Sequence, residues 1–258
     1  MKLLDHGSLE LIETWGSDER VIESARMSTQ KGFQGWAQRC QRCRASNTPE
    51  MLRVMPTCED GINHIWVAGD EKLLRYLYEH QHMTPFEMAG ATFEVQAPIF
   101  VFREWHRHRT QSYNEASARY LPLPDLNYIP TVERLMMTGG KGGKQASSTG
   151  ATLTEAGAEV FRKQLKQAYI DDQGIYEAAL RDGVPKELAR LVLPVGRYSR
   201  MRASANLRNW LAFLTLRQDA AAQYEIRIYA DAVAECLRSS FPRTMQLFDE
   251  KGDQTNDI

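Results

Sequence analysis

The sequence of 258 residues lacks the features that mark several special classes of protein. It contains no apolar run approaching the roughly eighteen residues that span a bilayer, so we expect no transmembrane helix. Its net charge of −1, with 25% charged residues, gives no reason to expect nucleic acid or an acidic membrane as a partner. The N-terminus carries acidic residues early and has no long apolar segment, which argues against a signal peptide. We therefore expect a cytoplasmic protein.

Cysteine is also scarce, and its spacing gives only a weak indication of a metal site. The four cysteines are Cys40, Cys43, Cys58 and Cys236. Cys40-x-x-Cys43, followed by Cys58 and His64, could in principle ligate zinc. A second closely spaced pair is missing, and cytosolic cysteines are ordinarily reduced. We therefore expect free thiols and no metal.

The sequence has no internal repeat, and its 43% of hydrophobic residues is enough for a sizeable core. Residues 91–97 alternate apolar and polar side chains, which predicts a half-buried strand. Helical signals are more frequent, and they predict helices over about residues 17–26, 70–80, 98–109, 152–183, 185–194, 206–217 and 219–240. Asp70 is expected to cap the second helix, and Thr152 with Glu155 the fourth. The predicted fold class is α+β, with helices packed on a small mixed or antiparallel sheet.

Two segments interrupt this pattern. Residues 31–69 mix Gly, Pro, Cys and Arg without a sustained period, which indicates an irregular insertion. Residues 138–150, TGGKGGKQASSTG, are low in complexity and predict a loop outside the core.

One segment, residues 107–120 (RHRTQSYNEASARY), gathers three arginines, a histidine, an asparagine, a glutamate and two serines. Arginine grips phosphate bidentately and does not deprotonate, while serine hydroxyls and backbone N–H groups complete a phosphate site. Asparagine and glutamate can bind sugar hydroxyls or base edges. The set suits a nucleotide monophosphate with a second anionic group nearby. A solvated helix end could explain Arg107, His108 and Arg109 alone, but not the polar residues that follow.

The order of several motifs resembles one known family. Arg107-His108-Arg109, followed after seven residues by Ser117, is similar to the signature of the flavin-dependent thymidylate synthases, the thymidylate synthase complementing protein family. Other blocks resemble those of the same family in order and rough spacing over about residues 18–235. These blocks lie at residues 82–87, 97–101, 187–194, 206–217 and 222–226.

The resemblance implies one domain over residues 1–258, with insertions at about 31–69 and 134–150, that forms a homotetramer whose active sites draw on several subunits. The residues implied to bind FAD are Ser28, Thr84, Glu87, Arg107, His108, Arg109, Asn114, Glu115, Asn206 and Arg208. The residues implied to bind dUMP are Glu104, Arg107, Glu115, Ser117, Ala118 through its backbone, Arg119, Arg190 and Arg217. His82 is expected near the flavin and the folate entry.

The implied reaction methylates C5 of dUMP to give dTMP, with methylenetetrahydrofolate as carbon donor, reduced FAD as hydride source and NADPH as reductant. Arg217, Ser117 and His82 are expected nearest to the chemistry, with Arg217 stabilising charge on the uracil oxygens. None of the cysteines lies in the matching blocks. A serine nucleophile needs an adjacent general base, and Ser117 has arginines and Glu115 as neighbours, so we expect it to position the substrate.

Three positions depart from the family pattern. Glu104 stands where glutamine is more common, and Ala212 and Ala221 stand where polar residues are usual. Glu104 could form an ion pair within its own helix, with Arg107 or His108, or it could change the demand on the nucleotide's sugar or base. Three interpretations follow: a thymidylate synthase, a flavoenzyme that modifies C5 of a pyrimidine nucleotide differently, for example by hydroxymethylation, and a catalytically silent nucleotide-binding relative.

Overall fold

The structure is a computed structural model that describes residues 1–58, 61–137 and 153–255. The chain divides into two compact units, each assembled from separate stretches of sequence. The first unit comprises Met1–Glu13, Thr92–Ala205 and Ala212–Glu235, and the second comprises Thr14–Ala91, Asn206–Leu211 and Cys236–Ile258. No helix in the described ranges combines the length and the apolar character needed to cross a membrane.

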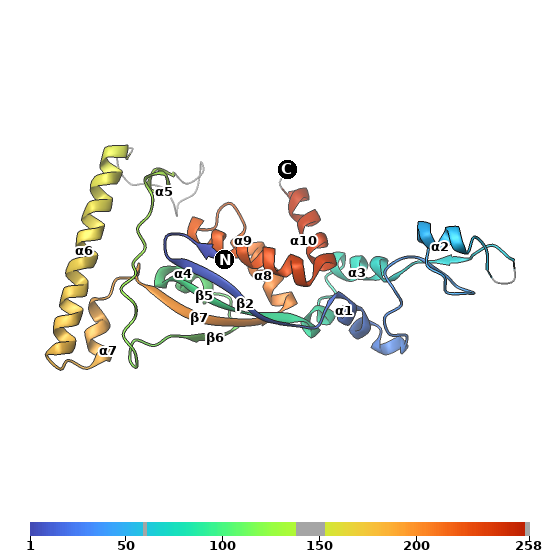
Figure 1. The fold of residues 1–258 in the computed structure, drawn as a ribbon, viewed down its shortest axis with the longest axis horizontal. Coiled ribbons are helices and arrows are strands. Elements are labelled where there is room, and N and C mark those ends of the chain that lie inside the picture. Colours follow the sequence, from blue (N-terminus) through green and yellow to red (C-terminus); the bar gives the residue numbers. More distant parts are fainter. Residues whose placement is uncertain (59–60, 138–152, 256–258) are drawn as a thin grey trace. The chain divides into compact units, whose positions relative to one another are not determined.

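A five-stranded sheet with strand order β1-β2-β5-β7-β6 has most of its residues in the first unit (Figure 1). Its strands are β1 (Lys2–Leu3), β2 (Gly7–Trp15), β5 (Gly90–Pro98), β6 (Ser112–Glu115) and β7 (Tyr198–Asn206). β1 pairs antiparallel with β2, and β6 pairs antiparallel with β7. In the central strand β5, Phe93, Val95 and Ala97 are fully buried, while Glu94 and Gln96 are only half-buried. This alternation confirms the predicted strand.

The helices around this sheet follow the predicted α+β class. Those that lie wholly in the first unit are α4 (Ile99–Trp105), α5 (Val132–Met136), α6 (Glu155–Arg181), α7 (Lys186–Ala189) and the 3-10 helix η3 (Arg190–Val192). Helices α8 (Leu207–Arg217) and α9 (Tyr224–Ser240) contribute residues to both units. At the start of α4 the N–H group of Ile99 donates to the carbonyl oxygen of Arg197 at 3.0 Å, which satisfies a donor that a helix N-terminus leaves unpaired. At its end, the ring of Trp105 packs 4.7 Å from the ring of Phe213.

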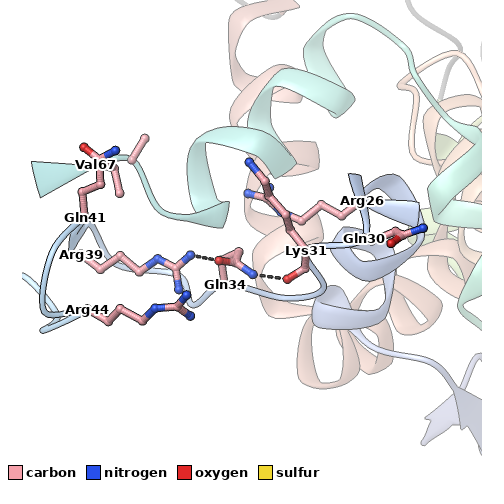
Figure 2. A pocket seen from close by; sticks show the side chains of 9 residues that line it. Arg26, Gln30, Lys31, Gln34, Arg39, Gln41, Arg44 and Val67 are labelled. Atoms are coloured by element: carbon pink, nitrogen blue, oxygen red, sulfur yellow. Dashed lines mark hydrogen bonds between the residues drawn. The ribbon is translucent and has the colours of Figure 1, made fainter. Parts of the chain in front are cut away.

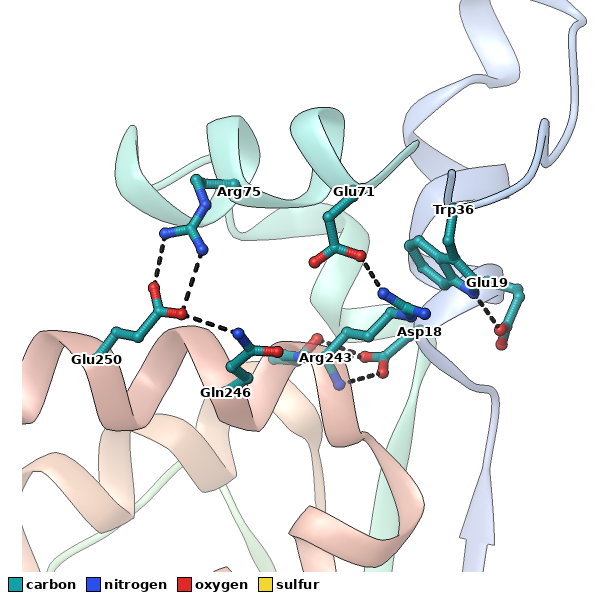
Figure 3. Close-up of polar contacts among 9 residues, drawn as sticks. Asp18, Glu19, Trp36, Glu71, Arg75, Arg243, Gln246 and Glu250 are labelled. Atoms are coloured by element: carbon teal, nitrogen blue, oxygen red, sulfur yellow. Dashed lines mark hydrogen bonds and ion pairs between the residues drawn. The ribbon is translucent and has the colours of Figure 1, made fainter. Parts of the chain in front are cut away.

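The second unit is held by a polar junction at Asp18. Its elements are α1 (Asp18–Ala25), η1 (Met27–Thr29), β3 (Arg39–Cys40), α2 (Pro49–Val54), β4 (Trp66–Val67), α3 (Asp70–Glu79), η2 (Thr84–Met88) and α10 (Pro242–Thr255). The buried Asp18 carboxylate accepts hydrogen bonds from the backbone N–H groups of Arg243 and Thr244, at 2.8 and 3.2 Å, and from the Thr244 hydroxyl at 2.6 Å. Arg243 also pairs with Glu71, so the first turn of α10 is bound to both α1 and α3 (Figure 3).

Several predicted helix boundaries are confirmed. Ser17 caps α1 and accepts from the N–H of Arg20 at 3.3 Å, and Pro185 immediately precedes α7. The predicted cap at Asp70 is wrong, because Gly69 is the N-cap of α3 and the Asp70 carboxylate instead accepts from Nε of Arg26 at 2.9 Å.

Other elements differ from the sequence prediction. Thr154 caps α6, while Thr152 and the predicted loop at 138–150 lie outside the described residues. α9 begins at Tyr224 rather than near Asp219, and β2 and α10 are not predicted. The insertion over residues 31–69 is less irregular than expected, since it contains α2 and the antiparallel pair of β3 and β4.

We expect Asp18→Ala to destabilise the second unit. The change removes three hydrogen bonds to a buried carboxylate and should lower the free energy of unfolding by about 3 kcal/mol. Urea denaturation measures this difference. Glu23→Ala, on the same helix, removes only the exposed pair with Arg20 and should cost less than about 0.5 kcal/mol. Equal effects of the two substitutions would contradict the role of Asp18.

Candidate functional site

Three of the predicted ligand-binding side chains meet in the first unit: Glu104 of α4, His108 in the turn that follows, and Arg217 at the end of α8. Nε–H of Arg217 donates to Nε2 of His108 at 2.9 Å. Its Nη1 donates to the Glu104 carboxylate at 2.7 Å, and its Nη2 to the Glu104 carbonyl oxygen at 2.8 Å. The Arg217 side chain is 14% exposed and that of Glu104 is 41% exposed. The guanidinium is thus oriented by three bonds, while the carboxylate beside it is open to solvent.

This contact corrects the local pairing considered for Glu104. Its partner is Arg217, 113 residues away in sequence, rather than Arg107 or His108 on the same helical turn. The ion pair therefore joins α4 to α8 and fixes the direction of a predicted catalytic arginine.

His108 is neutral in this arrangement. Burial, and secondarily the charge of Arg217, lower the pKa of His108 from 6.5 to about 4, with the Glu104 carboxylate opposing the shift. Because Nε2 accepts a hydrogen bond from Arg217, the single proton of the neutral ring lies on Nδ1. The imidazole therefore orients the guanidinium without adding a second positive charge.

Arg107 and Arg109, on either side of His108, are exposed. Within the described part of the chain neither guanidinium makes a hydrogen bond or an ion pair. Two free guanidinium groups so close in sequence are suited to binding phosphate oxygens.

The predicted ligands Asn114 and Glu115 lie in β6, at the edge of the sheet. They are opposite Arg202 and Met201 of β7. Adjacent side chains of a strand point to opposite faces, so the side chains of Asn114 and Glu115 lie on opposite faces of the sheet.

The loop after β6 brings the predicted phosphate ligands together. Oγ of Ser117 accepts from the backbone N–H of Arg119 at 3.3 Å, and Ala118 between them is buried. Nε of Arg119 donates to the carboxylate of Glu187 at 3.1 Å, and Nε of Arg190 donates to the Glu187 carbonyl oxygen at 3.4 Å. Both arginines are exposed and contact the same residue of α7.

A second group of predicted residues lies in the second unit. Glu87, in the same 3-10 helix as Thr84, forms an ion pair with Arg208 of α8. Oδ1 of Asn206 accepts from the N–H of Asn209 at 3.0 Å, so Asn206 caps α8. The residues predicted to bind flavin therefore include one cluster at the start of α8.

Ser28 and His82 are also in the second unit and are exposed. Ser28 lies in η1, and His82 lies in the turn after α3 with its ring 5.7 Å from that of Tyr76. Among the described residues, neither forms a hydrogen bond or ion pair with the cluster at the start of α8.

Sequence reasoning missed a basic cavity of about 590 Å³ in the second unit (Figure 2). Its lining residues are Arg26, Gln30, Lys31, Gln34, Arg39, Gln41, Arg44, Val67 and Ala68. Four of these are cations, which favours an anionic ligand. Ser28 lies between two of the lining residues in sequence. The recurrence of Lys and Arg over residues 31–44 was the available signal.

Comparison with known proteins identifies the class to which this fold and this set of residues belong. The model of the family described as thymidylate synthase complementing protein matches residues 10–243. The chain belongs to this family, as its motifs predict, and is an enzyme of the flavin-dependent thymidylate synthase type.

Two curated relatives carry the name flavin-dependent thymidylate synthase. That of Thermus thermophilus is 36% identical over 248 residues, covering 96% of this chain and 77% of the relative. That of Thermosipho africanus is 34% identical over 247 residues, covering 96% of this chain and 92% of the relative.

The chain is also similar to a solved structure, the UMP/dUMP methylase PolB from Streptomyces cacaoi. The complex of PolB with 5-Br dUMP has a TM-score of 0.73 and 31% identity, covering 97% of each chain. The complex with 5-Br UMP has a TM-score of 0.72 and 28% identity, covering 96% of each chain.

The low pKa of His108 gives a direct test of the Arg217 contact. We expect the His108 ring to titrate near pH 4 rather than 6.5 in an NMR titration. In Arg217→Gln the midpoint should rise but stay below 6.5, because burial is the larger cause of the shift. Since the folded state disfavours the protonated ring, His108 stabilises the fold above pH 6.5, and this contribution is lost as the pH falls towards 4. An unchanged midpoint in Arg217→Gln would contradict an effect of the Arg217 charge on the ring.

Proposed function

We propose that this enzyme methylates C5 of dUMP to form dTMP, with FAD as cofactor, methylenetetrahydrofolate as carbon donor and NADPH as reductant. The observation that carries the proposal is the charged, largely buried Arg217, oriented by neutral His108 and by Glu104. Uracil C5 attacks a one-carbon electrophile more readily when negative charge on the ring oxygens is stabilised. A fixed guanidinium in a shielded position supplies that stabilisation with little reorganisation.

The residues present fit FAD. When bound, the flavin supplies the hydride for the reaction. The two unpaired guanidinium groups of Arg107 and Arg109 suit its diphosphate, since arginine binds phosphate oxygens through paired N–H donors. Arg208 and Glu87 offer further polar groups at the start of α8. We assign the other predicted contacts, from Ser28, Thr84, His108, Asn114, Glu115 and Asn206, to the same cofactor.

The nucleotide phosphate is assigned to Arg119 and Arg190. Their common contact with Glu187 supports this assignment, because it holds both cations beside one loop. Ser117 and the backbone of Ala118 lie in that loop, where a hydroxyl and an N–H group can complete a phosphate site. No histidine or carboxylate is recorded as a hydrogen-bond partner of Ser117 in the described chain, which favours positioning over nucleophilic attack. His82 is assigned to the flavin and folate entry.

A homotetramer is part of the proposal, and the surface of α6 supports it. This helix has 27 residues, of which only Ala158 and Tyr176 are buried. Several apolar side chains along it are exposed, with Phe161 at 45% and Ile170 at 64%. Exposed apolar surface of this extent is typical of contacts between subunits, and a second copy of this chain is the proposed occupant.

The proposal is tested by product analysis. Protein loaded with FAD should convert dUMP to dTMP in the presence of methylenetetrahydrofolate and NADPH, as measured by mass spectrometry of the nucleotide. Arg217→Gln should lower kcat about a hundredfold or more, because a fixed charge is lost where charge develops. A hydroxymethylated product would establish the alternative reaction, and absence of any turnover with bound FAD would refute the proposal.

UMP is a second candidate substrate. The observation that favours it is the half-exposed carboxylate of Glu104 next to Arg217, together with the similarity to a UMP/dUMP methylase. An ionised carboxylate only accepts hydrogen bonds, and the 2′-hydroxyl that distinguishes UMP from dUMP is a donor. Glu104 is therefore the position at which the ribose could be preferred or tolerated.

Glu104→Gln separates the two possible roles of this residue. A neutral amide oxygen still accepts from Arg217 but binds a hydroxyl less strongly than a carboxylate does. If Glu104 contacts the sugar, kcat/KM for UMP relative to dUMP should fall severalfold, measured with the two nucleotides in competition. An unchanged ratio would show that Glu104 serves only to orient Arg217.

A further inference from the structure

Four potential metal ligands converge in the second unit, apart from the residues assigned to nucleotide and flavin. They are Cys40, Cys43, Cys58 and His64, and their ligand atoms all lie within 4.8 Å of one another. Sγ of Cys40 is 3.5 Å from Sγ of Cys58, and Nδ1 of His64 is 3.4 Å from Sγ of both Cys43 and Cys58. A zinc ion with Zn–S near 2.3 Å and Zn–N near 2.0 Å holds tetrahedral ligand atoms about 3.5–3.8 Å apart. The three separations of 3.4–3.5 Å match that geometry closely, and the remaining pairs lie within 4.8 Å.

The first pair of ligands is formed by a tight turn after β3. Cys40 pairs with Trp66 of β4, which fixes the strand, and the N–H of Arg44 donates back to the Cys40 carbonyl at 3.0 Å. Arg44 has a φ of 62°, a conformation that non-glycine residues seldom adopt. This turn returns Cys43 to the side of Cys40. The N–H of Arg42 also points to Sγ of Cys40 at 3.4 Å, a contact that favours a thiolate there.

The second pair, Cys58 and His64, is formed by the fold rather than by close spacing. The N–H group of Cys58 donates to the carbonyl oxygen of Ile62 at 2.9 Å. Nε2 of His64 lies 2.9 Å from the carbonyl oxygen of Met55 and donates to it. The ring proton is thereby held on Nε2, and the lone pair of Nδ1 faces the thiols, as in a metal-binding histidine oriented by a second hydrogen bond.

The segment around these ligands has almost no hydrophobic core. Between residues 31 and 68 the buried residues, among those described, are Cys40, Ala45 and Cys58. Near its start, the segment is anchored to α1 by Trp36, whose Nε1 donates to the Glu19 carboxylate at 2.9 Å. The β3–β4 hairpin and α2, which follow, bury few apolar side chains. Small structures of this kind usually depend on a disulfide or a metal. The sulfur separation of 3.5 Å is far from the roughly 2.05 Å of a disulfide.

We propose that Cys40, Cys43, Cys58 and His64 bind one zinc ion as a structural site. Four protein ligands close the coordination shell and leave no position for substrate, so the ion stabilises the fold and takes no part in catalysis. Binding releases the thiol protons and couples metal affinity to the folding of the segment. Arg39 of β3 and Arg44 of the turn after it both line the basic cavity (Figure 2), so the ion also fixes these two cations.

The test is metal analysis of the full-length chain, purified without an affinity tag and under reducing conditions. Mass spectrometry of the metal content should find about one zinc per chain. Cys43→Ser and His64→Ala should each retain less than a tenth of that amount. Cys236→Ser removes the one cysteine outside the cluster and should retain all of it.

A second measurement does not depend on the variants folding. Cobalt(II) added to metal-free unmodified protein should give the intense visible absorption of a tetrahedral thiolate complex, and zinc should abolish it. Chelation should also speed tryptic cleavage after Arg42 and Arg44 at least severalfold. Protein that takes up neither metal, a zinc content equal in Cys43→Ser, or a Cys40–Cys58 disulfide in the reduced preparation would each overturn the proposal.

Discussion

The burial of strand β5 determines the position of the residues around the Arg217 contact. Because Phe93, Val95 and Ala97 are fully enclosed, the strand can occupy only the centre of the sheet and only one register. Helix α4 starts at the next residue and has seven residues, so Glu104 follows at a fixed height and direction. The buried core strand therefore fixes the position of the Glu104–Arg217 ion pair, because α4 follows β5 without an intervening loop.

The parts of the fold that could be predicted are those with a local signal. The alternation in β5 and the serine cap at Ser17 depend on a few consecutive residues, and both are confirmed. Strand β2 was missed because its burial is clear only at Gly7 and Leu9, too short a stretch to show a period of two. Helix α10 was missed because Pro242, which ends the preceding helix, also occupies the first position of a new one.

The candidate site shows the same limit. The motif order led to the family and to the residues that we propose bind ligand, but the sequence alone shows only which residues are neighbours along the chain. From the sequence, the candidate partners of Glu104 were Arg107 and His108, three and four residues away. Its partner in the structure is Arg217 of α8. Likewise, Cys58 and His64 are not a close pair in sequence, yet Sγ of Cys58 lies 3.4 Å from Nδ1 of His64 in the fold. Long-range pairing of this kind depends on the completed fold.

Glu187 has a consequence for how the enzyme receives its nucleotide. In the structure, the Glu187 carboxylate forms an ion pair with Arg119, the residue to which we assign the nucleotide phosphate. Under the proposed assignment, a nucleotide phosphate competes with this carboxylate for Arg119, so its apparent affinity would be lower than its affinity for an unpaired arginine. In return, the ion pair holds the Arg119 guanidinium beside α7. Under the same assignment, nucleotide binding would depend less on salt concentration than binding to an unpaired arginine, because screening weakens both the ion pair that breaks and the one that forms.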